Sequence, residues 1–162
     1  MNNYSIRLAD YDDESDAKAI VSLMREYALI ENCDRDALND LPRLLREIDN
    51  GFTVLAWSSF EEHEPVGLIN CFFGYSTFQL RPLVNIHDVI VTEFHRGKGV
   101  AGQMLAGVES ESRNANACRI TLEVLGDNAS AIIAYEKYGF GKDPSHPKVD
   151  TYFMRKTLVG EQ

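Results

Sequence analysis

The 162-residue chain is acidic, with 16 Lys and Arg against 25 Asp and Glu and a formal net charge of −9. So few cations disfavour a general nucleic-acid surface, which needs Lys and Arg to neutralise phosphates. Hydrophobic residues make up 44% and charged residues 25%, which is the composition of a folded globular protein rather than a disordered one. The length fits one domain, and we expect residues 1–162 to form it.

The apolar runs are short and broken by charges, so the sequence predicts no membrane span. Residues 1–10 lack the basic start and long apolar core of a signal peptide, and we therefore expect a cytoplasmic protein. Cys33, Cys71 and Cys118 are widely separated, which favours reduced thiols over a disulfide framework or a zinc site. No two histidines stand at ligand spacing, and we expect no bound metal.

Hydrophobic periodicity predicts both strands and helices along the chain. Strands are expected at residues 4–8, 53–58, 65–73, 83–91, 119–124 and 151–158. Helices are expected after the acids at 12–15, after Asp40, after the glycines at 97–102 and at 129–138, with Gly139 at the C′ position. These elements predict an α/β fold with a mixed sheet.

One apolar strand runs through a polar bend into a glycine-rich turn, after which a helix with one apolar face begins. A helix start presents unpaired backbone N–H groups and the positive end of the helix dipole, which suit a phosphate or pyrophosphate. Gly97, Gly99 and Gly102 would let an anion approach the backbone, and Arg96 and Lys98 add positive charge beside it. The stretch therefore predicts a site for a phosphorylated ligand.

The spacing Gly97-x-Gly99-x-x-Gly102 also satisfies the dinucleotide-binding fingerprint, and Glu123 lies where that interpretation requires a ribose-binding acid. The fingerprint normally follows its strand at once, whereas residues 92–96 intervene here. Only 39 residues follow Glu123, too few for the remaining strand and helix units of a doubly wound sheet. Two less favoured alternatives are therefore a dinucleotide site and a helix start that binds no ligand.

Two segments resemble the GNAT superfamily of N-acetyltransferases. The first, Arg96-Gly97-Lys98-Gly99-Val100-Ala101, is similar to the R/Q-x-x-G-x-G/A loop that grips the pyrophosphate of acetyl-coenzyme A in that family. The second, Asn128-x-x-Ala131-x-x-x-Tyr135-x-Lys137-x-Gly139-Phe140, is similar to the family's N-x-x-A-x-x-x-Y-x-K-x-G-F segment. The resemblance extends over roughly residues 50–158.

The resemblance implies a single-domain GNAT-type fold, in which a mixed, mostly antiparallel sheet of six to seven strands is flanked by about four helices. It also implies acetyl-coenzyme A as co-substrate, held by the glycine loop through Gly102. In the family, the end of the preceding strand pairs with the pantetheine arm through its backbone and polarises the thioester oxygen. The residues implied for this strand end are Val89, Ile90 and Val91.

The second segment carries the implied catalytic acid. Tyr135 occupies the family position whose hydroxyl lies near the cofactor sulfur, where it would protonate the departing thiolate. The structural alternative is a tyrosine that packs the helix against the sheet. Asn128 and Ala131 are implied in cofactor binding, and Asn128 also suits the N-cap of the helix that begins at 129. Tyr138 is the less favoured candidate for the catalytic acid.

The general base is implied on the strand before the loop. His87 and Asp88 lie where related polyamine acetyltransferases carry an acidic pair, and His87 replaces the first acid. A histidine suits a base at neutral pH, either directly or through water. The alternative is a structural polar pair in the sheet, since buried polar side chains usually find partners.

Residues 72–91 are most similar to the spermidine/spermine branch of the family, so we expect a polyamine or diamine acceptor. Tyr75, Phe78 and Asn85 resemble positions around the acceptor pocket, and Glu123 is either an exposed strand residue or a second active-site carboxylate. Amino acids, aminoglycosides, peptide N-termini and lysine side chains stay open as acceptors, as does a coenzyme A-binding regulatory module without turnover. By analogy with the family, the chain could form a homodimer.

Overall fold

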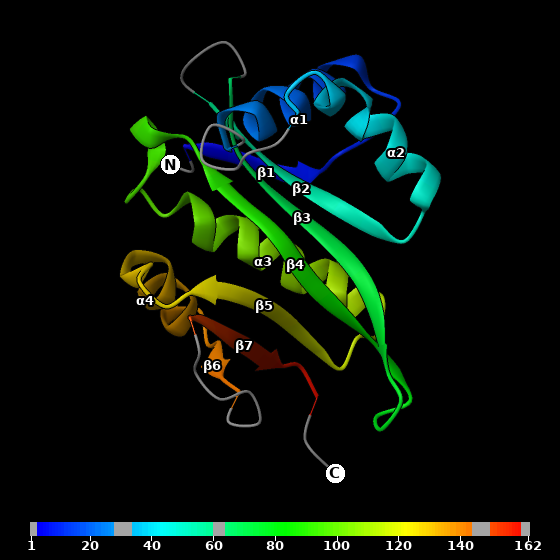
Figure 1. Cartoon of the computed structure of the whole chain (residues 1–162), viewed down its shortest axis with the longest axis vertical. Helices are drawn as coiled ribbons and strands as arrows, with labels where there is room; N and C mark the ends of the chain where they lie inside the picture. The colour runs from blue at the N-terminus through cyan, green and yellow to red at the C-terminus, as the bar shows by residue number, and fades with distance from the viewer. Residues whose placement is uncertain (1–2, 28–33, 60–63, 144–149, 160–162) are drawn as a thin grey trace. The chain divides into compact units, whose positions relative to one another are not determined.

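The computed structural model describes residues 3–27, 34–59, 64–143 and 150–159. This part of the chain forms a seven-stranded sheet with the strand order β1-β2-β3-β4-β5-β7-β6 (Figure 1). The β4–β5 pair is parallel, and the β1–β2, β5–β7 and β6–β7 pairs are antiparallel. The expected α/β class, with a mostly antiparallel sheet and four α-helices among the described residues, is confirmed.

The strands are β1 (Tyr4–Leu8), β2 (Gly51–Ser58), β3 (Pro65–Ser76), β4 (Arg81–Val91), β5 (Arg119–Leu125), β6 (Gly141–Lys142) and β7 (Thr151–Thr157). The helices are α1 (Glu14–Tyr27), α2 (Leu41–Ile48), α3 (Val100–Asn114) and α4 (Ala129–Lys137), with 3₁₀ turns η1 (Ala37–Asp40) and η2 (Glu93–His95). The sequence predicted all of the α-helices and every strand except β6, which has only two residues.

The largest difference between predicted and observed boundaries concerns β3 and β4. Strand β3 ends three residues after its predicted limit, and β4 begins two residues before its predicted limit. The expected connection at 74–82 is therefore a tight turn at 77–80, in which Leu80 adopts a left-handed φ of 50°. Gly74 lies within β3 and close to Leu83 of β4: a Cβ on Gly74 would lie 3.0 Å from Leu83 Cδ1. The glycine permits a close approach between neighbouring strands.

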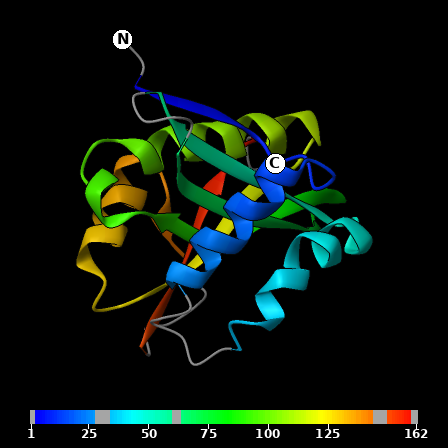
Figure 2. The same ribbon diagram turned by 90° about the horizontal axis from the view of Figure 1, so that it is seen from above.

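The described chain divides into two compact units, and the first comprises residues 1–70 and 88–107. In it β1 pairs with β2 from Tyr4 opposite Ser58 to Leu8 opposite Val54. Helices α1 and α3 lie on opposite sides of these strands (Figure 2). Val54 faces α3, since a Cβ on Gly107 would lie 3.3 Å from Val54 Cγ1. The first unit is therefore a sheet segment covered on both faces.

The connection from β1 to α1 is held by an ion pair. The guanidinium of Arg7 binds both carboxylate oxygens of Asp16, each at 2.5 Å. The Asp16 side chain is fully buried, whereas that of Arg7 is 46% exposed. Asp16 also accepts a hydrogen bond from the backbone N–H of Asp10 at 2.8 Å. The buried carboxylate is thus satisfied from two sides, as a buried charge must be.

The second compact unit comprises residues 71–87 and 108–162. Strand β5 pairs along its whole length with β7, and Val84–Ile86 of β4 pair in parallel with Ile120–Leu122. The inward side chains Ile120, Leu122 and Met154 are at most 1% exposed. This unit therefore has an apolar core of its own, built on the alternation of residues along β5 and β7.

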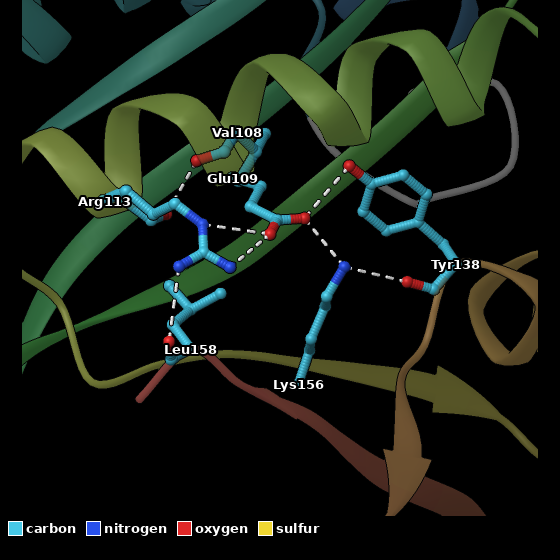
Figure 3. Close-up of polar contacts among 7 residues, drawn as sticks. Val108, Glu109, Arg113, Tyr138, Lys156 and Leu158 are labelled. Atoms are coloured by element: carbon cyan, nitrogen blue, oxygen red, sulfur yellow. Dashed lines mark hydrogen bonds and ion pairs between the residues drawn. The ribbon is translucent and has the colours of Figure 1, made fainter. Parts of the chain in front are cut away.

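A polar cluster ties three elements of the second unit together (Figure 3). Glu109 on α3 accepts hydrogen bonds from Lys156 Nζ on β7 at 2.7 Å, from the Tyr138 hydroxyl at 3.2 Å and from Arg113 Nη2 at 2.7 Å. The hydrogen bond from Lys156 is the main cause that lowers the pKa of Glu109 to about 2. Burial, with the nearby Glu109 charge, raises the pKa of Tyr138 to about 12.

Cys71 and Cys118 are buried thiols, while Cys33 lies outside the described residues. Within the described ranges, no three or more His, Cys, Asp or Glu side chains gather as metal ligands. Across those same ranges, none of the helices has the length and apolar character needed to cross a bilayer.

Candidate acyl-carrier site

The glycine loop joins β4 to α3 through η2. The chain leaves the sheet at Thr92, whose N–H donates to the Val66 carbonyl at 2.9 Å. His95 follows in η2, and its Nδ1 lies 3.1 Å from the Tyr4 hydroxyl, with the two rings edge-on. The contact joins residues 91 positions apart, where no local sequence pattern operates, so the sequence did not indicate it. The contact fixes the approach to the loop on β1.

The loop glycines have the backbone geometry that the anion site requires. Gly97 and Gly99 have φ values of 72° and 82°, in the left-handed region that residues with a Cβ adopt at a cost. The first backbone bond of α3 is donated by Gln103 N–H to the Gly99 carbonyl at 3.2 Å. The N–H groups of the residues in between, 100–102, therefore have no acceptor within the helix.

The space around these donors is open. A Cβ on Gly97, Gly99 or Gly102 would meet no atom within 4 Å, and the residues of the loop from Arg96 to Gly99 are exposed. Helix α3 has 15 residues, so the positive end of its dipole lies at the same place as the unpaired donors. The arrangement fits a phosphate or pyrophosphate.

Polar groups on either side of the loop add to this fit. Arg96 Nε donates to the Val91 carbonyl at 3.0 Å, which holds the guanidinium beside the end of β4. Within the described part of the chain, the buried atoms Thr92 Oγ1 and Gln103 Oε1 have no hydrogen-bond partner. A buried polar atom without a partner is costly, and one precedes the loop while the other lies in the first turn of α3. A bound polar ligand would supply such partners.

The strand end predicted to pair with a pantetheine arm is Val89, Ile90 and Val91. Ile90 is 5% exposed, and the two valines are half-buried. The parallel register of β4 with β5 covers Val84–Ile86, and β4 continues for five residues beyond it. The three residues predicted to bind the pantetheine arm through their backbone therefore lie beyond the segment of β4 that pairs with β5 in this register.

The two predicted base residues have different surroundings. His87 is exposed, and its ring packs edge-on against Phe72 with the centroids 5.1 Å apart. Asp88 is half-buried, and its Oδ2 accepts a 3.0 Å hydrogen bond from Nδ2 of Asn70 on β3. The structural alternative, a polar pair between His87 and Asp88, does not form. Each side chain has its own partner on β3.

The residues of the second predicted motif lie in the second unit. Asn128 Oδ1 accepts a 3.2 Å hydrogen bond from Ala131 N–H, so it caps α4. Tyr135 is 8% exposed, and its ring lies 6.0 Å from that of Phe140. Gly139 follows the helix with a φ of 96°, which suits its predicted C′ position. The motif therefore builds a capped, well-anchored helix.

The predicted acceptor-pocket residues also belong to the second unit. Tyr75, near the end of β3, is 60% exposed, and Phe78, in the turn between β3 and β4, is 96% exposed. Asn85 Nδ2 donates to Thr121 Oγ1 at 3.0 Å, across the parallel pair. Glu123 is exposed on β5, opposite Phe153 of β7. No hydrogen bond, ion pair or ring contact joins any two of these four described side chains.

The sequence matches the family model described as "Acetyltransferase (GNAT) family" over residues 17–140. Two Bacillus subtilis proteins named as uncharacterized N-acetyltransferases are similar: YhfO, at 24% identity over 80% of this chain and 86% of YhfO, and YobR, at 33% identity over 38% of this chain. The match with YobR spans a quarter of that protein's length.

Solved structures share the fold. The NatC complex bound to Gag peptide and CoA includes a chain with a TM-score of 0.74 at 20% identity, covering 97% of this chain and 99% of that one. The proposed acetyltransferase yncA of Salmonella typhimurium, solved with acetyl-CoA, gives a TM-score of 0.72 at 20% identity, covering 99% of this chain and 96% of that one.

The match to the family model extends well beyond the glycine loop, from α1 to Phe140, and includes both motifs on which the resemblance rested. The dinucleotide interpretation of the glycine spacing is therefore set aside. The expectations of an acyltransferase and of acetyl-coenzyme A as the group donor are confirmed at the level of the family. This chain belongs to the acetyltransferase (GNAT) family.

Proposed function

We propose that this protein transfers the acetyl group of acetyl-coenzyme A to a primary amine of a small molecule, by direct attack of the amine on the thioester. The observation that carries the proposal is the loop from Arg96 to Gly102. Two glycines with positive φ, unpaired N–H groups at the start of α3 and two cations form a diphosphate site there, in a chain of the acetyltransferase family.

Three segments of the chain have proposed roles in binding the donor, acetyl-coenzyme A. The loop binds the diphosphate, and the backbone of Val89, Ile90 and Val91 pairs with the pantetheine arm as an added strand. One of these N–H groups polarises the thioester carbonyl. Asn128 and Ala131 contribute to binding the arm in addition to starting α4. Acetyl-coenzyme A supplies the activated acyl group, and the chain supplies orientation and proton transfer.

The reaction needs three proton transfers: two from the nitrogen of the acceptor and one to the sulfur of the donor. An alkylamine has a pKa near 10.4, so about one molecule in two thousand is neutral at pH 7, and the pair His87 and Asp88 offers an acceptor for its proton. The neutral nitrogen forms the new C–N bond as the C–S bond breaks. Tyr135 then gives its hydroxyl proton to the departing thiolate, and the tyrosinate recovers a proton from the attacking nitrogen, which must lose it to become the amide nitrogen. The products are the amide and coenzyme A with a protonated thiol.

A polyamine or diamine is the proposed acceptor. The similarity of residues 72–91 to the spermidine/spermine branch supports it, and an acidic chain of net charge −9 favours a cationic partner. Tyr75, Phe78, Asn85 and Glu123 keep their proposed role in acceptor binding. A cytoplasmic location and a homodimer also stay predictions.

The test is an acceptor panel with acetyl-coenzyme A, in which release of free thiol is measured. The panel contains spermidine, a diamine, amino acids, an aminoglycoside and a peptide with a free N-terminus, because one structural neighbour carries a peptide. We expect turnover with the polyamine and the diamine. If the peptide were the only acceptor that is acetylated, the acceptor would be a protein or peptide amine and the proposed small-molecule acceptor would be wrong.

A binding measurement separates the enzyme from the regulatory alternative. We expect coenzyme A to raise the melting temperature, because a ligand that binds only the folded state stabilises it, and we expect NAD to have no such effect. Stabilisation by coenzyme A without thiol release from any acceptor would favour the regulatory module. If coenzyme A did not raise the melting temperature, the proposal that the glycine loop binds this donor would be wrong.

A further inference from the structure

A buried line of hydrogen bonds crosses the first unit and ends at Asp88. Asn70 Nδ2 on β3 donates to Asp88 Oδ2 at 3.0 Å. Thr53 Oγ1 on β2 donates to Asn70 Oδ1 at 2.7 Å, and the Tyr11 hydroxyl lies 2.9 Å from Thr53 Oγ1. Thr53 and Asn70 are 1% and 2% exposed. The bonds therefore form away from water, where a missing partner is costly.

The bonds of this line all point the same way. A threonine hydroxyl has one proton, and Thr53 gives it to Asn70, so Tyr11 must be the donor to Thr53. The same network fixes the amide of Asn70, with its oxygen toward Thr53 and its nitrogen toward Asp88. The second side of Nδ2 lies 3.6 Å from Met24 Sδ on α1. A one-way line of donors suits an ionised carboxylate at its end, because that group only accepts.

The other carboxylate oxygen is available. Among the described residues, no donor is bonded to Asp88 Oδ1, and no cation forms an ion pair with this carboxylate. The adjacent titratable side chain, His87, packs against Phe72 instead. Asp88 immediately precedes the strand end proposed to bind the pantetheine arm. One oxygen is thus held from inside the sheet, and the other is left to accept a proton.

We propose that Asn70 is a positioning residue for the acceptor amine's general base, Asp88, through the hydrogen bond from its Nδ2. The inference rests on the proposed acetyl transfer. It assigns the base within the predicted pair to Asp88, because this carboxylate has a fixed orientation and a free oxygen. A purely structural Asn70 would stabilise the first unit without affecting the ionisation of Asp88.

The sharpest variant is Asn70→Asp. It keeps an oxygen to accept the Thr53 proton, but replaces the amide donor with a second carboxylate beside Asp88. Two carboxylates at this separation cannot both ionise freely, so the apparent pKa of the pair rises. We expect the acid limb of kcat/KM for the amine to move up by about one pH unit or more, and kcat at neutral pH to fall by about tenfold.

Asn70→Leu is the second variant. It removes the donor without adding charge, and loss of a hydrogen bond to the charged form also raises the carboxylate pKa. Thr53→Val is the matched control, because it breaks the same buried line one step earlier and leaves the Asn70–Asp88 bond in place. It should lower the melting temperature as Asn70→Leu does, while the acid limb stays within about 0.3 pH unit of the unaltered protein.

A substrate-free measurement keeps this inference separate from the proposed function. The carboxyl ¹³C shift of Asp88, followed against pH, reports its pKa without any acetyl transfer. We expect both Asn70 variants to raise it and Thr53→Val to leave it nearly unchanged. If the Asn70 variants and Thr53→Val give the same Asp88 titration and the same acid limb, Asn70 is only structural. An unaltered protein that acetylates no amine would instead defeat the proposed function.

Discussion

Arg96 Nε donates a 3.0 Å hydrogen bond to the carbonyl oxygen of Val91. The bond joins the first cation of the glycine loop to the last residue of β4, and it leaves both terminal nitrogens of the guanidinium for a ligand. An arginine that already donates to a backbone carbonyl, as Arg96 does to Val91, is oriented before it binds an anion, so less freedom is lost on binding. The cation and the strand end proposed to hold the donor are therefore coupled.

This coupling predicts how cofactor affinity changes with residue 96. We expect Arg96→Ala to raise the KM for acetyl-coenzyme A by about tenfold, since a charge-assisted hydrogen bond is lost. Arg96→Lys should fall between, because an ammonium cannot span Val91 and a phosphate as a planar fork does. The control is Arg81→Ala, at the other end of β4, where Arg81 binds Asn116. A KM unchanged in Arg96→Ala would contradict a diphosphate at this loop.

Tyr135 and Tyr138, near the end of α4, give a matched test of the proposed acid. Tyr135 is buried and Tyr138 is half-buried. Tyr135→Phe should lower kcat by about a hundredfold, with little change in the KM for acetyl-coenzyme A. Tyr138 donates to Glu109, and its pKa is raised to about 12, which makes it a poor acid. Tyr138→Phe should therefore retain turnover. Full kcat in Tyr135→Phe at saturating substrates would exclude this residue from proton transfer.

Single substitutions can distinguish His87 from Asp88 as the general base. Because Asp88 has an anchored carboxylate whereas His87 is exposed against Phe72, Asp88→Asn should lower kcat/KM for the amine by about a hundredfold. His87→Gln should cost less than about tenfold and preserve the shape of the pH profile. Loss of the acid limb in His87→Gln, with Asp88→Asn still active, would make the histidine the base.

The parts of the site that the sequence predicted are those set by neighbouring residues. A glycine with positive φ, an asparagine cap and a C′ glycine each depend on a few adjacent positions, and Gly99, Asn128 and Gly139 have the expected conformations or bonds. Local physics operates over one turn of chain. These features are therefore readable from spacing alone.

The parts that the sequence did not predict join distant residues. Asn70 lies 18 positions from Asp88, and Tyr4 lies 91 positions from His95. Such pairs depend on which strands become neighbours, and a single sequence does not specify that register. The polar residues were visible in the sequence, but their partners were not. For the same reason the sequence did not indicate that His87 and Asp88 contact Phe72 and Asn70 of β3 instead of forming the alternative structural pair.

The buried ion pair between β1 and α1 predicts an asymmetry in stability. Arg7→Met would leave the fully buried Asp16 carboxylate with the Asp10 N–H but without a cation, and we expect a loss of about 3 kcal/mol in the free energy of unfolding. Asp16→Asn would leave only Arg7, which is 46% exposed and can be hydrated, so its cost should be smaller. Urea denaturation at pH 7 measures both. Equal losses would contradict the asymmetry.

The cluster around Glu109 predicts how stability depends on acid (Figure 3). The pKa of Glu109 is lowered to about 2, chiefly by the hydrogen bond from Lys156, whereas the unfolded chain should have the ordinary value near 4.5. The folded state therefore gains stability from this carboxylate at any pH above about 4.5, and loses it as the pH falls toward 2. After allowance for solvent screening, we expect a contribution of about 1–2 kcal/mol.

Glu109→Gln tests this by removing the titration. Its deficit in unfolding free energy relative to the unaltered protein should be largest above pH 5 and should shrink as the pH approaches 2, because the protonated Glu109 has also lost its charge. Glu136→Gln is the control, since Glu136 is exposed and lies 3.9 Å from Lys142, where an ion pair contributes little. Its deficit should be small at every pH. A Glu109→Gln deficit that stays constant from pH 6 to pH 2 would mean that Glu109 titrates alike in the folded and unfolded chains, and that the bond to Lys156 does not stabilise its charged form.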